Sequence, residues 1–123
     1  MIHIDTSFMI RALEPDSEAD RKLRVWLHRY EPLAMSAIAW AEFLCGPIEP
    51  AQIELTARIV PSRVPFEEDD ARIAAGLFNA SGRRRGSLTD CMIAASAVRM
   101  NAKLATVNRA DFQRFADSGL ELA

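Results

Sequence analysis

The first ten residues, MIHIDTSFMI (residues 1–10), hold the pattern that decides the fold. The β-branched and apolar residues over 2–5 predict a short strand that ends at Asp5, and a second apolar stretch predicts a helix over 7–13. Asp5 therefore lies at the carboxyl end of a strand. In that position it either caps the next helix or belongs to a functional site.

Length and composition predict one soluble domain over residues 1–123. Half of the residues are hydrophobic and about a quarter are charged, and the net charge of −2 argues against wholesale electrostatic attraction to nucleic acid. No leader-like or membrane-spanning segment is evident, so we expect a cytoplasmic protein with no membrane association. Cys45 and Cys91 lack metal-ligand spacing and are expected to be small buried hydrophobic residues.

Strands and helices alternate along the whole chain. Pro65 cannot donate to a ladder, so the strand that contains it is expected near a sheet edge. Further strands are predicted over 33–35, 63–66, 103–107 and 120–122, and further helices over 17–30, 37–45, 50–60, 67–81, 88–101 and 109–116. This alternation predicts an α/β fold with a central, mainly parallel sheet of four to five short strands and helices on both faces.

Two more acids are expected at the same edge of the sheet as Asp5. Asp111 follows the strand over 103–107 within a few residues, and Asp90 opens the helix over 88–101, where a carboxylate interacts favourably with the helix dipole. The spacing from Ser87 to Asp90, and from Asn108 to Asp111, also fits a capping box. A capping role and a functional role both stay open for these two acids.

Glu42 is the only ionisable side chain between Ser36 and Cys45. Its neighbours are apolar, so the sequence predicts a helix that is buried nearly all round. A lone buried carboxylate is costly and needs a cation, hydrogen-bond donors or a metal ion. The sequence favours a functional role for Glu42 over a long-range ion pair with an arginine.

Four motifs in this order resemble a PIN domain, and in particular the VapC ribonuclease toxins of bacterial toxin–antitoxin pairs: I-D-T-S, S-x-x-x-W-x-E-F-x-x-G, L-T-D-x-x-I-A-A-x-A and L-A-T-x-N-x-x-D-F. The resemblance covers the whole chain and implies a three-layer α/β/α sandwich. It also implies a divalent-metal-dependent endoribonuclease that uses Mg²⁺ or Mn²⁺, a cognate VapB-type antitoxin, and a homodimer. The implied catalytic and metal-binding acids are Asp5, Glu42, Asp90 and Asp111, and the implied supporting pocket residues are Thr6, Ser7, Thr106 and Asn108. The fourth acidic position varies among relatives, so either Asp111 or Asn108 completes the site.

The loop Gly82-Arg83-Arg84-Arg85-Gly86 places three cations between two predicted helices. These cations are suited to RNA phosphate contacts, and ordinary solvation of the loop is the open alternative. A receiver or phosphatase would keep its acids together after the first strand, whereas here they are dispersed. A non-catalytic PIN-like module that binds RNA or protein is the remaining alternative, although none of the four acids is missing.

Overall fold

The computed structural model describes all residues from 1 to 123 and contains one parallel sheet. Its strands are β1 (Ile2–Ile4), β2 (Leu33–Ser36), β3 (Ser62–Val64), β4 (Lys103–Ala105) and β5 (Glu121–Leu122), in the order β3-β2-β1-β4-β5. Every neighbouring pair is parallel, with His3 opposite Ala34 on one side and Leu104 on the other. The predicted α/β class and parallel sheet are confirmed, and β3 is an edge strand as Pro65 indicated.

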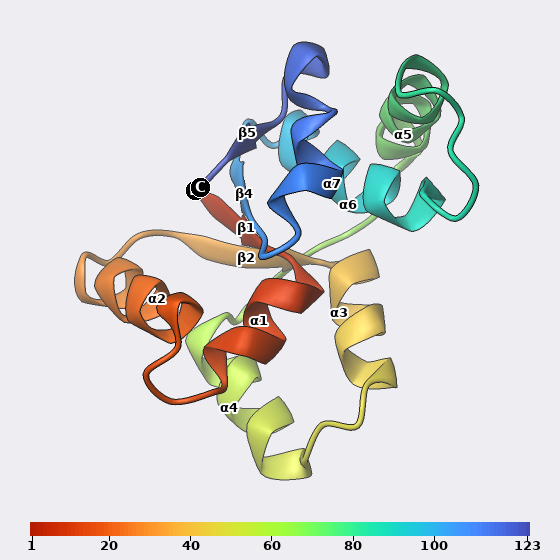
Figure 1. Cartoon of the computed structure of the whole chain (residues 1–123). Coiled ribbons are helices and arrows are strands. Elements are labelled where there is room, and N and C mark those ends of the chain that lie inside the picture. Colours follow the sequence, from red (N-terminus) through yellow and green to blue (C-terminus); the bar gives the residue numbers. More distant parts are fainter.

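Helices connect these strands and cover both faces of the sheet. They are α1 (Thr6–Ala12), α2 (Glu18–His28), α3 (Ala37–Cys45), α4 (Pro50–Ile59), α5 (Glu68–Ala80), α6 (Leu88–Arg99) and α7 (Arg109–Gln113), followed by the short 3₁₀ helix η1 (Ala116–Ser118). Figure 1 shows α1 and α2 on one side of the sheet and α5 and α6 on the other. None of the helices combines the length and apolar character needed to cross a bilayer.

The core forms where the apolar faces of these helices meet the sheet. Phe8 of α1 stacks on Trp26 of α2, with ring centroids 5.4 Å apart. Along α6 the small residues Ala94, Ala95 and Ala97 are fully buried, and their short side chains allow close packing between α5 and the sheet. The helix starts follow local capping rules, since the Ser36 Oγ accepts from the Ala39 N–H at 3.1 Å.

A buried ion pair joins the first turn of α5 to the end of α6. Asp70 is fully buried and accepts from the Nε and Nη2 of Arg99, while its Oδ2 also accepts from the Glu67 N–H at 2.9 Å. Arg99 donates in addition to the Pro65 carbonyl at 3.2 Å. The arginine thus ties the end of α6 to the segment from Pro65 to Asp70, which lies far from it in the sequence.

Two sequence predictions about burial were wrong. In α3 only Ala39 and Phe43 are buried, and Glu42 is exposed, so this helix is not buried all round. It packs on α1, α6 and the neighbouring strands through one face, and its other face meets solvent. Cys45 is exposed for the same reason, whereas Cys91 is fully buried as expected.

The strand order determines where a ligand site can form. After β1 the chain moves outward through β2 to β3, and it then returns to place β4 on the other side of β1. The order therefore reverses between β1 and β4. In open parallel sheets, ligands bind outside the carboxyl ends of the strands at such a reversal.

Candidate active site

Asp5 lies at the reversal point, directly after β1, and its carboxylate is held by three hydrogen bonds. Its Oδ1 accepts from the Thr6 N–H, and its Oδ2 accepts from the hydroxyls of Ser7 and Thr106, each at 2.8 Å. The Asp5 N–H donates to the Ala105 carbonyl at 2.9 Å, which joins the ends of β1 and β4. Asp5 is therefore both the cap of α1 and the centre of a polar network that a cap alone does not need.

Thr106 extends this network along the loop that follows β4. The predicted strand over 103–107 ends at Ala105, which leaves Thr106 at its carboxyl end. Its buried hydroxyl donates to Asp5, accepts from the Asn108 N–H at 3.0 Å, and lies 3.2 Å from the Ser7 Oγ. Two hydroxyls thus fix the orientation of one carboxylate.

Glu42 reaches the same site from the exposed side of α3. Its Oε1 lies 3.2 Å from the Thr6 Oγ1, and that hydroxyl also lies 2.9 Å from the Ala39 carbonyl. The partial burial of its carboxylate raises the Glu42 pKa, the Thr6 hydrogen bond opposes the rise, and the charges of Asp5 and Asp90 add to it. The side-chain partner of Glu42 is therefore Thr6 rather than an arginine, and its exposure means that it needs no buried counter-ion.

Asp90 projects from the first turn of α6 and is half-buried. Burial raises its pKa, the charges of Asp5 and Asp111 raise it further, and Arg114 and Arg84 oppose the rise. Ser87 makes no capping hydrogen bond and instead donates to the Arg84 carbonyl at 2.7 Å. The capping alternative for Asp90 is therefore wrong, and its carboxylate is left free for other contacts.

Asp111 and Asn108 lie at the start of α7. Asn108 is exposed and makes no side-chain capping bond, so the capping alternative for Asp111 is also wrong. The Asp111 Oδ1 lies 3.5 Å from the Nη1 of Arg84. The three arginines of the predicted basic loop have different surroundings. Arg84 reaches the acidic site, and Arg85 is exposed. Arg83 donates to Asn79 and lies over the Phe78 ring.

Arg114 is a member of this site that the sequence did not indicate. Its Nε donates to the Asp111 carbonyl at 2.7 Å, its Nη2 lies 3.9 Å from the Asp90 Oδ2, and its guanidinium lies over the Phe115 ring. Its Nη1 is buried without a hydrogen-bond partner. The only signal in the sequence is its spacing of three residues from Asp111 on a short helix, which is common on any charged helix.

Asp5, Glu42 and Asp90 thus interact electrostatically at the reversal point, and Asp111 interacts with Asp90. All of their ligand atoms are oxygens, the donor type that Mg²⁺ and Mn²⁺ prefer. The chain contains no group of three acidic, histidine or cysteine side chains already gathered as metal ligands. The chemistry of the site fits a hard divalent cation, although these carboxylates do not form a complete cage.

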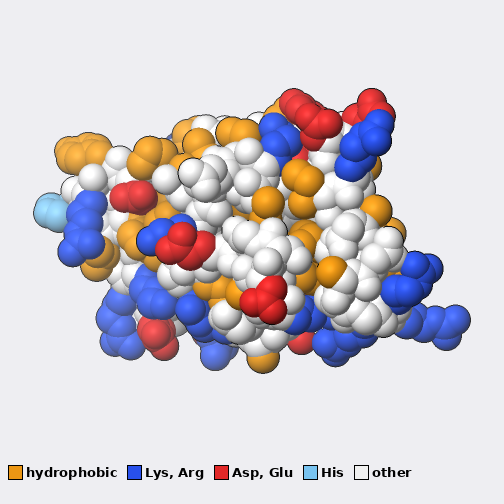
Figure 2. Space-filling view, turned by 90° about the horizontal axis from the view of Figure 1, so that it is seen from above, with side chains coloured by type: hydrophobic (Ala, Val, Ile, Leu, Met, Phe, Trp, Pro, Cys, Tyr) orange, Lys and Arg blue, Asp and Glu red, His pale blue; other side chains and the backbone are white.

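His3 lies two residues before Asp5 but takes no part in the network. Its side chain is buried and neither ring nitrogen has a hydrogen-bond partner. It is a core histidine with no hydrogen bond to the acidic site. Figure 2 shows Lys and Arg side chains along the lower and right-hand margins of one face, so local basic patches occur despite the negative net charge.

Comparisons with known proteins agree with this architecture. The family model described as "PIN domain" matches residues 2–118. No curated protein sequence matches the chain.

Several solved toxin–antitoxin structures share the fold. VapBC2 from Rickettsia felis, bound to a DNA fragment from its promoter, has a TM-score of 0.80 and 22% identity over 100% of this chain and 98% of that one. VapBC-1 from nontypeable Haemophilus influenzae has a TM-score of 0.75 and 26% identity over 100% and 97%. VapC20 from Mycobacterium tuberculosis, described as a toxin that cleaves the Sarcin-Ricin loop, has a TM-score of 0.71 and 14% identity over 100% and 98%.

Proposed function

This chain belongs to the PIN-domain family, and from that premise we propose that it is a VapC-type endoribonuclease toxin that hydrolyses RNA phosphodiester bonds with Mg²⁺ or Mn²⁺. The observation that carries the proposal is the oriented Asp5 carboxylate, which lies at the reversal point and interacts electrostatically with Glu42 and Asp90, while Asp111 interacts with Asp90. Solved relatives described as toxin–antitoxin complexes, and one described as cleaving the Sarcin-Ricin loop, support the toxin role and the RNA substrate.

The residues of the site have separable roles in such a reaction. Asp5, oriented by Ser7 and Thr106, and Asp90 would be the principal ligands of the metal ion, with Glu42 and Asp111 as direct or water-mediated ligands. A bound divalent ion supplies positive charge that activates water and offsets charge developing on the phosphodiester. Glu42, whose pKa is raised, is suited to accept a proton from the attacking water through its carboxylate.

Basic side chains around the acids are suited to holding the RNA backbone. Arg84 and Arg114 each lie beside an acid and bring positive charge to the edge of the site. We propose that the loop of Arg83, Arg84 and Arg85 contributes phosphate contacts, with Arg84 nearest to the reacting phosphate.

An apolar cavity supports the proposed antitoxin partner. It lies between α1, α2 and α4, has a volume of about 360 Å³, and is lined mainly by the apolar residues Met9, Leu13, Leu23, Leu27, Leu55 and Ile59. An apolar segment of an antitoxin that docked here would lie next to α1, the helix that Asp5 caps.

The exposed apolar side chains of α3, which include Ala37, Ala41 and Leu44, support the proposed homodimer.

The test is incubation of purified protein with total cellular RNA in Mg²⁺ or in chelator, followed by mapping of the cut ends. We expect cleavage only with metal, and we expect Asp5→Asn and Asp90→Asn to abolish it. Asp16→Asn, which neutralises an exposed acid outside the site, is the matched control and should cut normally. Equal cleavage by wild type and both site variants would refute the assignment, and RNA binding without cleavage would favour the non-catalytic module.

A further inference from the structure

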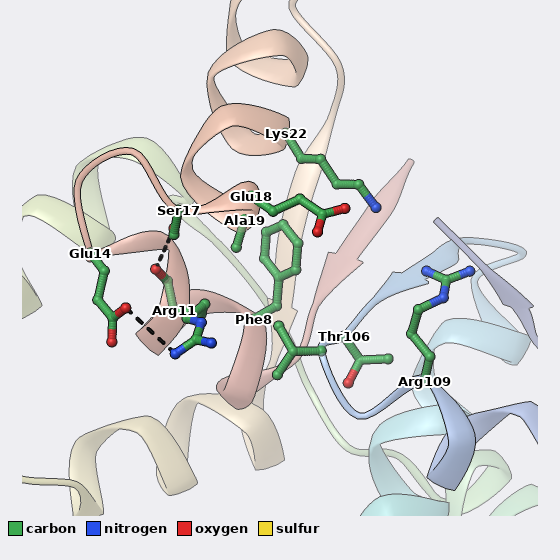
Figure 3. Close-up of a pocket in the computed structure, with 10 residues that line it drawn as sticks. Phe8, Arg11, Glu14, Ser17, Glu18, Ala19, Lys22, Thr106 and Arg109 are labelled. Carbon is green, nitrogen blue, oxygen red and sulfur yellow. Dashed lines mark hydrogen bonds and ion pairs between the residues drawn. The ribbon is translucent and has the colours of Figure 1, made fainter.

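A second cavity opens beside the acidic site and shares Thr106 with it. Its volume is about 490 Å³, and its walls come from α1, the start of α2, and the loop that leads from β4 into α7. Figure 3 shows Glu18 and Lys22 reaching from α2 and Arg109 from α7 on one side of Phe8, with Arg11 and Glu14 on the other. Since the Thr106 hydroxyl donates to Asp5, this cavity directly adjoins the proposed point of cleavage.

Some charged side chains in this cavity already have an ion-pair or hydrogen-bond partner within the protein, and others do not. Arg11 pairs with Glu14 at 3.5 Å, and the Nη1 of Arg109 donates to the Ala123 carbonyl at 2.8 Å. Lys22 and Glu18, one helical turn apart on α2, have no ion-pair or side-chain hydrogen-bond partner. One cation and one carboxylate are therefore available to a ligand.

We propose that this cavity holds one nucleotide of single-stranded RNA that flanks the cleaved phosphodiester. This inference rests on the proposed ribonuclease function. Lys22 contacts a phosphate of that nucleotide, and Glu18 contacts its base. The cavity thereby contributes to the choice of cleavage site.

The opposite charges of Lys22 and Glu18 assign the orientation of the nucleotide. Cations bind phosphates, whereas a carboxylate repels them and only accepts hydrogen bonds. Glu18 must therefore face donor groups, and the exocyclic amines of cytosine, adenine and guanine are such donors. Uracil has no amine, and its one ring donor, the N3–H, lies between two carbonyl oxygens that repel a carboxylate, so uracil should be disfavoured at this position.

One exposed apolar side chain suits the cavity to a base. Val107 is 47% exposed on one wall, where it offers apolar contact, whereas Phe8 is 3% exposed and stacks on Trp26, so it forms a fixed part of the lining. A cavity of this volume accepts one nucleotide but not the width of a duplex. Proteins usually read RNA sequence from such splayed single-stranded bases.

Two substitutions of residues that line the cavity test the inference, and each has a matched control outside the cavity. Lys22→Ala is compared with Arg21→Ala, a neighbouring cation of α2 outside the cavity, and Glu18→Gln with Glu54→Gln on α4. Cut ends are sequenced after each protein digests a randomised single-stranded RNA oligonucleotide. Binding of the same oligonucleotide is measured in an Asp5→Asn background at several salt concentrations.

We expect Lys22→Ala to weaken binding about fivefold to tenfold near 0.1 M salt and to reduce the salt slope by about one. Glu18→Gln should relax the bias against uracil at one position near the cut by about tenfold, because the glutamine amide can donate to a uracil carbonyl. Arg21→Ala and Glu54→Gln should match wild type in both measurements.

Failure of this inference is distinguishable from failure of the proposed function. If wild type cuts RNA and both cavity variants keep its cut positions and affinities, the nucleotide subsite is refuted while the ribonuclease function stands. The subsite is likewise refuted if the variants lose affinity only for an antitoxin, since the cavity then serves a protein partner. If wild type binds but does not cut RNA, the function fails, and a loss of binding in Lys22→Ala still supports the subsite. A protein that neither binds nor cuts RNA overturns both.

Discussion

Replacing His3 by leucine should make the protein more resistant to acid. His3 is 1% exposed in the central strand β1, and neither ring nitrogen has a hydrogen-bond partner. Burial, the Arg99 guanidinium and the N-terminal ammonium lower its pKa from 6.5 to about 4, while Asp70 opposes the change. Leucine is of similar size and removes both the unpaired nitrogens and the titration.

The sign and the magnitude follow from the difference in pKa between the unfolded and folded chains. The unfolded chain binds a proton at His3 below pH 6.5, but the folded protein does so only below about pH 4. Stability that is fully present above pH 6.5 is therefore lost as the pH falls towards 4. At 1.36 kcal/mol per pH unit, the total loss is about 3 kcal/mol, of which about 2 kcal/mol develops between pH 7 and pH 5.

The assay is urea unfolding followed by the fluorescence of Trp26 and Trp40 at pH 5, 6 and 7. The free energy of unfolding of His3→Leu relative to wild type should increase by about 2 kcal/mol between pH 7 and pH 5. At pH 7 the substitution should be neutral or stabilising, since it removes buried unpaired polar atoms.

Two comparisons isolate His3 in this assay. The raised pKa values of Asp5, Glu42 and Asp90 act in the opposite direction, because protonation of these acids favours the folded state, but they are common to both proteins and cancel in the difference. His28→Leu, at an exposed histidine, is the control and should follow the wild-type pH dependence. Parallel pH dependence of His3→Leu and wild type would refute the reasoning.

Three further experiments, which use five substitutions, give testable outcomes. Asp5→Asn should raise the melting temperature in chelator, because it removes a buried charge near other acids while nearly preserving the shape of the side chain. Addition of Mg²⁺ should reduce or reverse this gain. A variant that melts lower than wild type and does not respond to Mg²⁺ would mean that Asp5 only caps α1. Asp70→Asn should lower the free energy of unfolding by about 3 to 5 kcal/mol in urea titrations, because it leaves Arg99 without its buried counter-ion. A loss below about 1 kcal/mol would mean that the Asp70–Arg99 pair contributes little to the stability of the fold. Arg83, Arg84 and Arg85 can each be changed to alanine, and the salt slope of RNA binding should fall most for the Arg84 and Arg85 variants. It should fall least for the Arg83 variant, because Arg83 already contacts Asn79 and Phe78. An unchanged slope in all three variants would mean that the loop is only solvated.

Local chemistry in the sequence determined the elements of this fold. Hydrophobic periodicity located the five strands and the helices between them within a few residues, because backbone geometry depends on neighbouring residues. The edge strand before Pro65 was equally readable, since it follows from the N–H that proline lacks. The acids at strand ends stood out because parallel strands share their carboxyl edge.

Tertiary structure decided what is buried and what meets at the site. Periodicity shows that α3 is apolar, but only packing shows that one face of it remains open and that Glu42 is exposed there. The pairing of β1 with β4 joins Asp5 to Thr106, which lies 101 positions away in the sequence. Long-range packing of the same kind places Arg114 beside Asp90 and leaves the His3 ring without a hydrogen-bond partner. Such contacts depend on how distant surfaces fit together, and no local pattern in the sequence encodes that fit.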